Sequence, residues 1–361
     1  MKNRLKIGVI TTNLIRIPPR PEDLPAGFSG APEQIASVIM DGLVEKGHDV
    51  TLFASGDSKT RAKLVPTSKI SLAKDPNVGF SQERRQYFPY ELLGIVKAYQ
   101  TATAKKFDLL HSHLDFPTAY FSGFFKFPTV TTLHSPFFGT RLDIMKNFQR
   151  SQYYVSISNA QRKPLPGANF AATIYHGVDT KKFKFNPTPK NQAVIVGRIH
   201  KQKGISEAIE FAKKLNFKLI ILGSHQEDEY WQKKVKPNVD GRQIVYKNFL
   251  PQSEVIKIVS ESKFFLFPLQ WEEPFGLVLI EAMATGTPVV AYDRGSVAEI
   301  VKQGKTGFVA NTPSQIIFGI KNIEKISRVD CRRHVEQYFS YQKMIDNYES
   351  LFLKLAKKTP R

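Results

Sequence analysis

The chain of 361 residues is long enough for two domains of ordinary size, each with its own hydrophobic core. Hydrophobic residues make up 42% and charged residues 23%, which is typical of a soluble globular protein, and no apolar run approaches the ~20 residues that cross a bilayer. The net charge of +20 is unusually high for a globular protein. It predicts an anionic partner, which could be nucleic acid, a membrane surface or a substrate.

The distribution of the basic residues argues against one of these three partners, nucleic acid. Lysine and arginine are spread along the chain, with modest clusters at 97–106, 141–163 and 354–361, and no long basic block predicts a nucleic-acid arm. The start of the chain lacks a signal-peptide pattern, and Cys331 alone cannot form an intrachain disulfide. We therefore expect a cytoplasmic protein without a nucleic-acid partner, and contact with an anionic membrane face is a second expectation.

Short β-rich runs alternate with helical patterns, which predicts an α/β protein with parallel sheets built from βαβ units. In the first half the pattern predicts helices at about 31–46 and 90–106, and strands at 5–12, 49–53, 107–111, 129–133, 153–156 and 171–175. In the second half it predicts strands at 193–199, 218–223, 244–246, 264–268, 288–291 and 308–310, most of them followed by helical patterns.

The same pattern suggests how the domains are organised. The proline-punctuated segment 184–192 is the best candidate for a linker between two doubly wound domains, whose strand ends would then face one cleft. A final helix at about 341–357 has an apolar stripe at helical spacing, so it should dock on a domain. The stripe consists of Met344, Ile345, Tyr348, Leu351, Phe352 and Leu355.

The most informative motif is a pair of glutamates, Glu273 and Glu281, around the run Pro-Phe-Gly and an apolar helix at 277–284. One carboxylate precedes the helix, and the other lies roughly 12 Å along its axis at ~1.5 Å per residue. The backbone N–H groups of the first turn form an anion site between them, so the arrangement suits a nucleotide-sugar. The alternative is structural, because glutamates near helix starts favour the macrodipole, but Glu281 interrupts an otherwise apolar helix.

A basic loop follows the first strand of the second half. Gly197 and Gly204 enclose Arg198 and Lys203, two cations where phosphates commonly bind in such sheets. An ordinary basic loop is an equal alternative until the glutamate pair is placed at the mouth of the same sheet. Gly30, between the first strand and its helix, would let a ligand approach the backbone, although a simple turn explains it equally well.

His134 ends the strand at 129–133, where a hydrogen-bonding or acid/base role and a structural role are equally consistent with the sequence. His111, His113 and Asp115 resemble a ligand cluster, but no complementary spacing accompanies them, so we expect no metal. The chain has no Gly-x-Gly-x-x-Gly or Gly-x-Ser-x-Gly motif, and Gly304-Lys305-Thr306 is interpreted as a turn rather than a P-loop. We therefore expect no bound cofactor.

The run from Trp271 to Ala284, with Gly286-Thr287-Pro288 after it, resembles the paired-glutamate motif of the retaining glycosyltransferases of family 4, which have the GT-B fold. Gly197-Arg198 with Lys203-Gly204 resembles the family's diphosphate clamp. His176-Gly177-Val178-Asp179 is similar to its usual Asn-Gly-Val-Asp, with histidine in place of asparagine. Ser29 stands where the family often has a first glycine before Gly30.

This resemblance implies two Rossmann-like domains facing a cleft: residues 1–186 on the acceptor side, 187–338 on the donor side, and a helix at 339–361 crossing back to the first domain. Arg198 and Lys203 would bind the donor diphosphate, and Glu273 would bind the transferred sugar. Glu281 would bind the ribose. The remaining implied contacts are Gly30, Gly197, Phe275, Gly276 and Leu277 near phosphates and sugar, and His134 near the sugar.

The implied activity is metal-free transfer of a hexose, with retained configuration, from a nucleoside-diphosphate sugar to a glycan, lipid-linked or small-molecule acceptor. A phosphorylase or a sucrose- or trehalose-type enzyme on the same fold is the alternative, and a basic nucleic-acid-binding protein is the alternative from another class. No motif in the sequence indicates which sugar, nucleotide, acceptor or oligomeric state applies.

Overall fold

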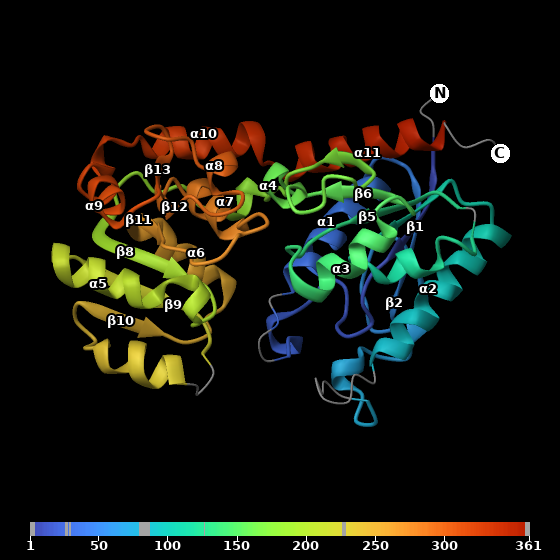
Figure 1. Ribbon diagram of the computed structural model, residues 1–361, viewed down its shortest axis with the longest axis horizontal. Helices are drawn as coiled ribbons and strands as arrows, with labels where there is room; N and C mark the ends of the chain where they lie inside the picture. The colour runs from blue at the N-terminus through green and yellow to red at the C-terminus, as the bar shows by residue number, and fades with distance from the viewer. Residues whose placement is uncertain are drawn as a thin grey trace. The chain divides into compact units, whose positions relative to one another are not determined.

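The computed structural model describes residues 4–25, 28, 30–78, 87–125, 127–225 and 229–357. The chain divides into two compact units (Figure 1). Unit 1 comprises Met1–Tyr175 and Tyr341–Arg361, and unit 2 comprises His176–Ser340. Each unit is built around a parallel sheet with strands and helices in alternation, which confirms the predicted α/β class.

Within the described residues, unit 1 has a seven-stranded sheet in the order β3-β2-β1-β4-β5-β6-β7. The strands are β1 (Lys6–Ile10), β2 (Asp49–Ser55), β3 (Lys63–Ser68), β4 (Leu109–Ser112), β5 (Thr129–Thr132), β6 (Tyr153–Ser156) and β7 (Phe170–Thr173). The helices are α1 (Ala31–Glu45), α2 (Tyr87–Ala104), α3 (Gly139–Phe148), α4 (Asn159–Arg162) and α11 (Tyr341–Ala356), with short turns η1 (Pro21–Asp23), η2 (Leu72–Lys74) and η3 (Pro117–Phe121).

The sheet of unit 2 has six strands among the described residues, in the order β10-β9-β8-β11-β12-β13. The strands are β8 (Lys190–Val196), β9 (Lys218–Leu222), β10 (Ile244–Lys247), β11 (Ser262–Phe267), β12 (Val289–Tyr292) and β13 (Gly307–Ala310). The helices are α5 (Ile205–Leu215), α6 (Gln252–Glu261), α7 (Leu277–Ala284), α8 (Val297–Ile300), α9 (Pro313–Lys321) and α10 (Arg328–Tyr338). Short helices are η4 (Thr180–Lys182), η5 (Lys201–Lys203), η6 (Trp231–Val235), η7 (Lys236–Asn238) and η8 (Ile323–Lys325).

In each sheet, successive strands are added on one side of the first strand and later strands on its other side. In unit 1 the first strand, β1, pairs with both β2 and β4, and in unit 2 the first strand, β8, pairs with both β9 and β11. Loops that leave the carboxyl ends of two such neighbouring strands diverge to opposite faces, and ligands of open α/β sheets bind at this point. The topology therefore directs attention to the ends of β1 and β4 in one unit and of β8 and β11 in the other.

Successive residues of β4 pack on opposite faces of the sheet of unit 1. Leu110 joins a cluster with Ile10 and Tyr99 under α2. The ring of His111 instead lies 5.1 Å from the ring of Tyr348, which belongs to α11. Helix α2 therefore covers one face and α11 the other.

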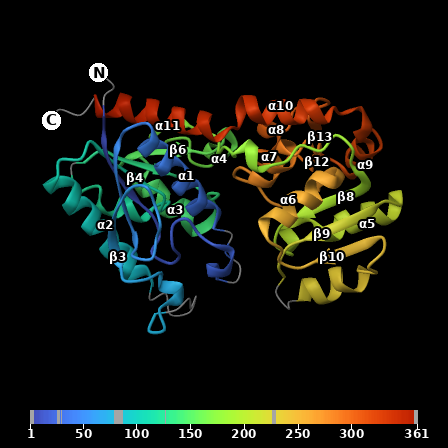
Figure 2. The ribbon, with the colours of Figure 1, turned by 180° about the vertical axis from the view of Figure 1, so that it is seen from behind.

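The C-terminal helix α11 docks on unit 1 as predicted, and all six residues of its apolar stripe are buried. Figure 2 shows α11 in red above the blue helix α1, with which it is in contact. A Cβ atom on Gly42 of α1 would come within 2.2 Å of Cδ1 of Ile345, so the two helices pack closely. Glu349 accepts hydrogen bonds from Nζ of Lys46 at 2.7 Å and Nε2 of His48 at 3.0 Å.

Every predicted strand is present within a few residues, but β3 and the helices α3, α4 and α10 were not predicted. The edge strand β3 is only partly buried and contains Pro66, so it lacks the pattern of a central strand. Helix α3 buries only Met145 and therefore has no apolar stripe. Lys305 lies in a turn, as interpreted from the sequence.

Segment 184–192 packs on unit 2. The backbone carbonyl of Asn186 accepts a hydrogen bond from Nε of Arg328 at 2.6 Å, and its N–H donates to Thr285 at 3.1 Å. Residues from Lys190 onward already form β8. The division between the units lies at Tyr175, earlier than the boundary expected after residue 186.

Candidate functional site

In unit 2 the loop after β8 is shaped by its glycines. Gly204 has φ +68°, and a Cβ atom there would lie 1.9 Å from the carbonyl oxygen of Pro268, so only glycine fits between η5 and the end of β11. The stem of Lys203 passes over Gly197, whose added Cβ would lie 3.7 Å from Cγ of the lysine. The loop thereby directs the ammonium group of Lys203 across the carboxyl edge of the sheet.

The ammonium of Lys203 pairs with the carboxylate of Glu273. The distance from Nζ to Oε2 is 3.1 Å, and the two side chains are 20% and 11% exposed. The indole N–H of Trp271 donates to the same oxygen at 3.1 Å, and Nζ lies 5.1 Å from the centre of the indole ring. Both donors bind Oε2, so the rotamer of Glu273 is fixed while Oε1 can accept from a ligand.

Two hydrogen bonds from Ser296 stabilise the loop that carries Glu273. The N–H of Ser296 donates to the carbonyl of Glu273 at 2.9 Å, and its hydroxyl donates to the carbonyl of Phe275 at 2.7 Å. Gly276, with φ +81°, precedes α7, and no side chain caps this N-terminus. The N–H groups of Leu277 and Val278 can therefore bind an anion, whereas that of Leu279 already donates to the carbonyl of Gly276 at 3.0 Å.

Phe275 contributes to this loop through packing. Its side chain is 2% exposed, and its ring lies 5.0 Å from that of His176 and 6.2 Å from that of Phe339. Only its backbone can face a ligand. Arg198 is exposed in the loop after β8, and its contact with a diphosphate stays a prediction.

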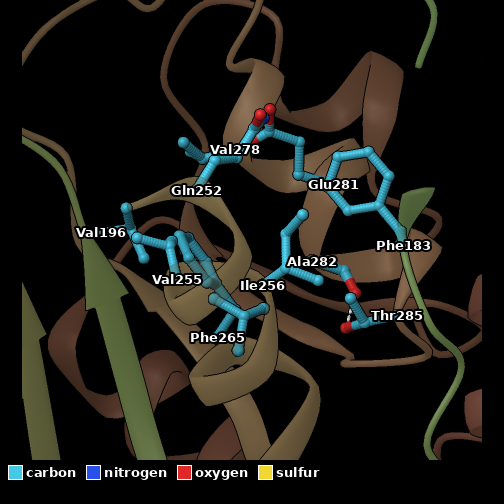
Figure 3. A pocket seen from close by; sticks show the side chains of 11 residues that line it. Phe183, Val196, Gln252, Val255, Ile256, Phe265, Val278, Glu281, Ala282 and Thr285 are labelled. Atoms are coloured by element: carbon cyan, nitrogen blue, oxygen red, sulfur yellow. Dashed lines mark hydrogen bonds between the residues drawn. The ribbon is translucent and has the colours of Figure 1, made fainter. Parts of the chain in front are cut away.

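Glu281 lies on α7 at the edge of a cavity of about 30 Å³ with apolar walls (Figure 3). Val278, Phe183 and Phe265 are among the side chains that line it. Burial raises the pKa of Glu281 to about 7. Among the described residues its carboxyl group has no hydrogen-bond partner, so burial alone accounts for the raised pKa.

In unit 1, His134 follows β5 and is fixed from two sides. Its backbone N–H donates to Oδ1 of Asp115 at 2.7 Å, and Asp115 also pairs with Arg141. Its Nε2 lies 2.9 Å from Nδ1 of His113, within hydrogen-bonding distance. Burial lowers the pKa of His134 to about 4, against the opposing effect of Asp115, so the imidazole is neutral at neutral pH.

Gly30 adopts a left-handed conformation, with φ +64°, at the start of α1. A Cβ atom there would come within 2.9 Å of Cδ2 of Leu24 and 3.1 Å of Pro19, so the turn itself requires glycine. Contact with phosphates stays a prediction. Ser29 lies outside the described residues.

Glu33, in the first turn of α1, was not predicted as a site residue. Burial, with a smaller effect from Glu91 and Asp115, raises its pKa to about 7. One of its carboxyl oxygens is buried without a hydrogen-bond partner among the described residues. The sequence gives no warning, because a glutamate in a first helical turn is ordinarily solvated.

The structure therefore brings together Gly197, Lys203, Glu273 and the start of α7 in unit 2, with Glu281 two turns along that helix. Gly30 and His134 belong to unit 1. No group of three or more histidine, cysteine, aspartate or glutamate side chains that could hold a metal occurs in the described part of the chain, His111, His113 and Asp115 included. The expectation of a metal-free site stays a prediction. No described helix is long and apolar enough to cross a membrane.

Comparison with known proteins gives two family matches. Residues 33–182 match the model of Glycosyltransferase Family 4, and residues 178–337 match that of Glycosyl transferases group 1. An uncharacterised glycosyltransferase of Methanocaldococcus jannaschii is 26% identical over 276 residues, which cover 69% of this chain and 76% of that protein.

Two solved structures are similar over nearly the whole chain. Sucrose-phosphate synthase from Thermosynechococcus elongatus has a TM-score of 0.76 at 18% identity, covering 99% of this chain and 100% of that one. HepE from Anabaena, in complex with UDP and glucose, has a TM-score of 0.70 at 19% identity, covering 97% and 100%. The two family matches and the fold together show that this chain belongs to the GT-B glycosyltransferases of family 4, group 1.

Proposed function

We propose that this glycosyltransferase moves a hexose from a nucleoside-diphosphate sugar to a hydroxyl group of a glycan, a lipid-linked molecule or a small molecule, with retained configuration. The observation that carries the proposal is the pair of Lys203 and Glu273, 3.1 Å apart beside the uncapped start of α7. A cation and a carboxylate side by side match a donor in which phosphates adjoin sugar hydroxyls.

The donor diphosphate would bind Arg198, Lys203 and the backbone N–H groups at Gly276 and Leu277. Gly197 has no side chain of its own, and the stem of Lys203 packs over it, 3.7 Å from where a Cβ atom would stand. These groups would stabilise the charge that develops on the leaving diphosphate, in a position fixed before the reaction begins.

Glu273 would accept hydrogen bonds from hydroxyls of the transferred sugar through Oε1, since Lys203 and Trp271 hold Oε2. Glu281 would accept from the ribose hydroxyls, and these donors would favour its ionised form. His134 would bind the transferred sugar as a neutral imidazole.

In the reaction, the bond from sugar C1 to the diphosphate oxygen breaks, and the acceptor oxygen bonds to C1 on the same face. The acceptor proton passes to an oxygen of the leaving phosphate. No metal takes part in this proposal, and neither Glu273 nor Glu281 acts as the nucleophile. The structural likeness to HepE, which was solved with UDP and glucose, supports this class of donor.

A second candidate is a sucrose-type transfer to a soluble sugar, which the likeness to sucrose-phosphate synthase favours. Both candidates need a nucleotide-sugar and differ in the acceptor. A phosphorylase on the same fold would instead need inorganic phosphate, so phosphate-dependent cleavage without nucleotide would exclude both. Contact with an anionic membrane belongs to the lipid-linked acceptor and would appear as binding to anionic vesicles.

The test is thermal unfolding with UDP, GDP and ADP. A nucleotide at about 100 times its Kd should stabilise the protein by about 2.7 kcal/mol. Lys203→Ala should abolish this gain. Lys190→Ala is the matched control, because Lys190 begins the same strand and pairs with Glu261 at 2.6 Å away from the site. If none of the three nucleotides stabilises the wild-type protein, the proposal fails.

A further inference from the structure

A buried chain of polar groups runs through unit 1 from the C-terminal helix to the candidate site. It begins at Tyr348 of α11, whose side chain is fully buried. The hydroxyl groups of Tyr348 and Thr132 lie 2.8 Å apart, and Oγ1 of Thr132 lies 2.9 Å from Nε2 of His111. Thr132 is the last residue of β5 and stands two residues before His134.

The tautomer of His111 follows from its surroundings. Burial lowers its pKa to about 3, so the ring carries one proton at neutral pH. Its Nδ1 is buried and has no partner among the described residues. Because a buried N–H without an acceptor is more costly than a buried lone pair, the proton belongs on Nε2, which donates to Thr132.

The next two members connect His111 to the strand end. The ring of His111 lies 4.3 Å from that of His113, at an angle of 53°. Nδ1 of His113 lies 2.9 Å from Nε2 of His134, and the two rings are 5.2 Å apart. The orientation of each ring thus limits the next, and Tyr348 holds the end of the series.

We propose that Tyr348 is a positioning residue for His134, acting through Thr132, His111 and His113. The catalytic part of this inference rests on the proposed contact of His134 with the transferred sugar. Tyr348 touches no substrate; it fixes the first ring of a series whose last ring does. Helix α11 therefore completes the site of unit 1 in addition to covering its sheet.

The same strand offers a matched control. The hydroxyl of Tyr99, on α2, lies 2.8 Å from Oγ1 of Thr129, the first residue of β5, and Tyr99 is also fully buried. Tyr348→Phe and Tyr99→Phe each remove one buried tyrosine–threonine hydrogen bond, at opposite ends of one strand. If the hydroxyl of Tyr348 only stabilised the fold, both variants should have the same effect on the histidine signals and on kcat.

The first measurement is NMR of the full chain labelled with ¹⁵N-histidine, without substrate. Tyr348→Phe should move the imidazole signals of His111, His113 and His134, assigned by replacing each histidine in turn, while Tyr99→Phe leaves them in place. Signals of His134 that are equally unchanged in both variants overturn the proposal, even if both variants lose the same stability.

The second measurement is hydrolysis, with water as acceptor, of the glucose conjugate of whichever nucleotide, UDP, GDP or ADP, stabilises the protein. Tyr348→Phe should lower kcat by about fivefold, the rate equivalent of one hydrogen bond, with an unchanged KM for the donor. Equal kcat values for the two phenylalanine variants overturn a positioning role in catalysis. If His134→Ala keeps full activity, the proposed role of His134 fails instead, and the histidine signals still decide whether Tyr348 orients the ring.

Discussion

The carboxyl edges of the two sheets carry different groups: a buried imidazole in unit 1 and a lysine–glutamate pair in unit 2. In unit 1 burial lowers the pKa of His134 to about 4 and raises that of Glu33 to about 7, and the ion pair of Asp115 with Arg141 lies beside His134. In unit 2 an ammonium and a carboxylate pair at 3.1 Å, with Arg198 exposed nearby. A neutral imidazole suits hydroxyl groups and cations suit phosphates, and on this ground we propose the donor phosphates for unit 2 and a sugar contact for unit 1.

The largest expected effect comes from removing the cation of unit 2. Lys203→Ala should lower kcat/KM by about 10²- to 10³-fold, as is found when one preorganised donor to a developing anion is lost. Steady-state assays with the stabilising nucleotide-sugar measure this, and Lys190→Ala should remain near wild type. Full turnover of the Lys203→Ala enzyme would contradict the proposed role of the Lys203 ammonium in stabilising the leaving diphosphate.

The next effect tests the buried carboxyl group of Glu33 in unit 1. Below pH 4.5 Glu33 is protonated in both the folded and the unfolded chain. As pH rises toward 7 the unfolded chain loses the proton first, so stability falls by about 3 kcal/mol and stays lower above pH 7. Glu33→Gln should lack this loss, which urea unfolding at pH 4.5 and 8 would measure.

A glutamate on the same helix provides the comparison for Glu33. Glu45 is exposed at the end of α1 and pairs with Arg61. Glu45→Gln should follow the wild-type pH dependence. If Glu33→Gln follows it too, the carboxyl of Glu33 is solvated and the contrast between the units is lost.

Glu281 has a similarly raised pKa but is proposed to bind the donor. Comparing it with Glu33 therefore distinguishes the effect of burial on stability from an effect on nucleotide binding. Glu281→Gln should also gain stability above pH 7, because the fold then no longer has to bury an ionised carboxylate. In contrast to Glu33→Gln, it should weaken nucleotide binding about tenfold through the lost bond to the ribose. Calorimetric titration of both variants with the stabilising nucleotide makes the comparison, and equal Kd values would contradict the ribose assignment.

The sequence predicted what depends on local pattern. The helix of Glu281 was predicted at 277–284 and lies at Leu277–Ala284. It could be predicted because an apolar run between glycine and proline residues is a local pattern typical of a buried helix. The stripe of α11 was predicted for the same reason. The contact of Lys203 with Glu273 joins residues far apart in the chain, and the burial of Glu33 and of the Phe275 ring depends on packing from other elements, so none of these is written in a local pattern.

The smallest expected effect sharpens the charged edge. Trp271→Phe keeps an aromatic ring near Nζ of Lys203 but removes the N–H that donates to Glu273 at 3.1 Å. One lost hydrogen bond to a carboxylate should lower kcat/KM about fivefold to tenfold. Phe267→Leu is the counterpart, because it removes the other ring near Nζ, at 5.8 Å, and no hydrogen bond. If the two variants lose the same activity, the rings around the ammonium matter and the indole N–H does not. A larger loss in Trp271→Phe would mean that unit 2 needs Glu273 fixed as well as charged, just as unit 1 needs its neutral imidazoles fixed.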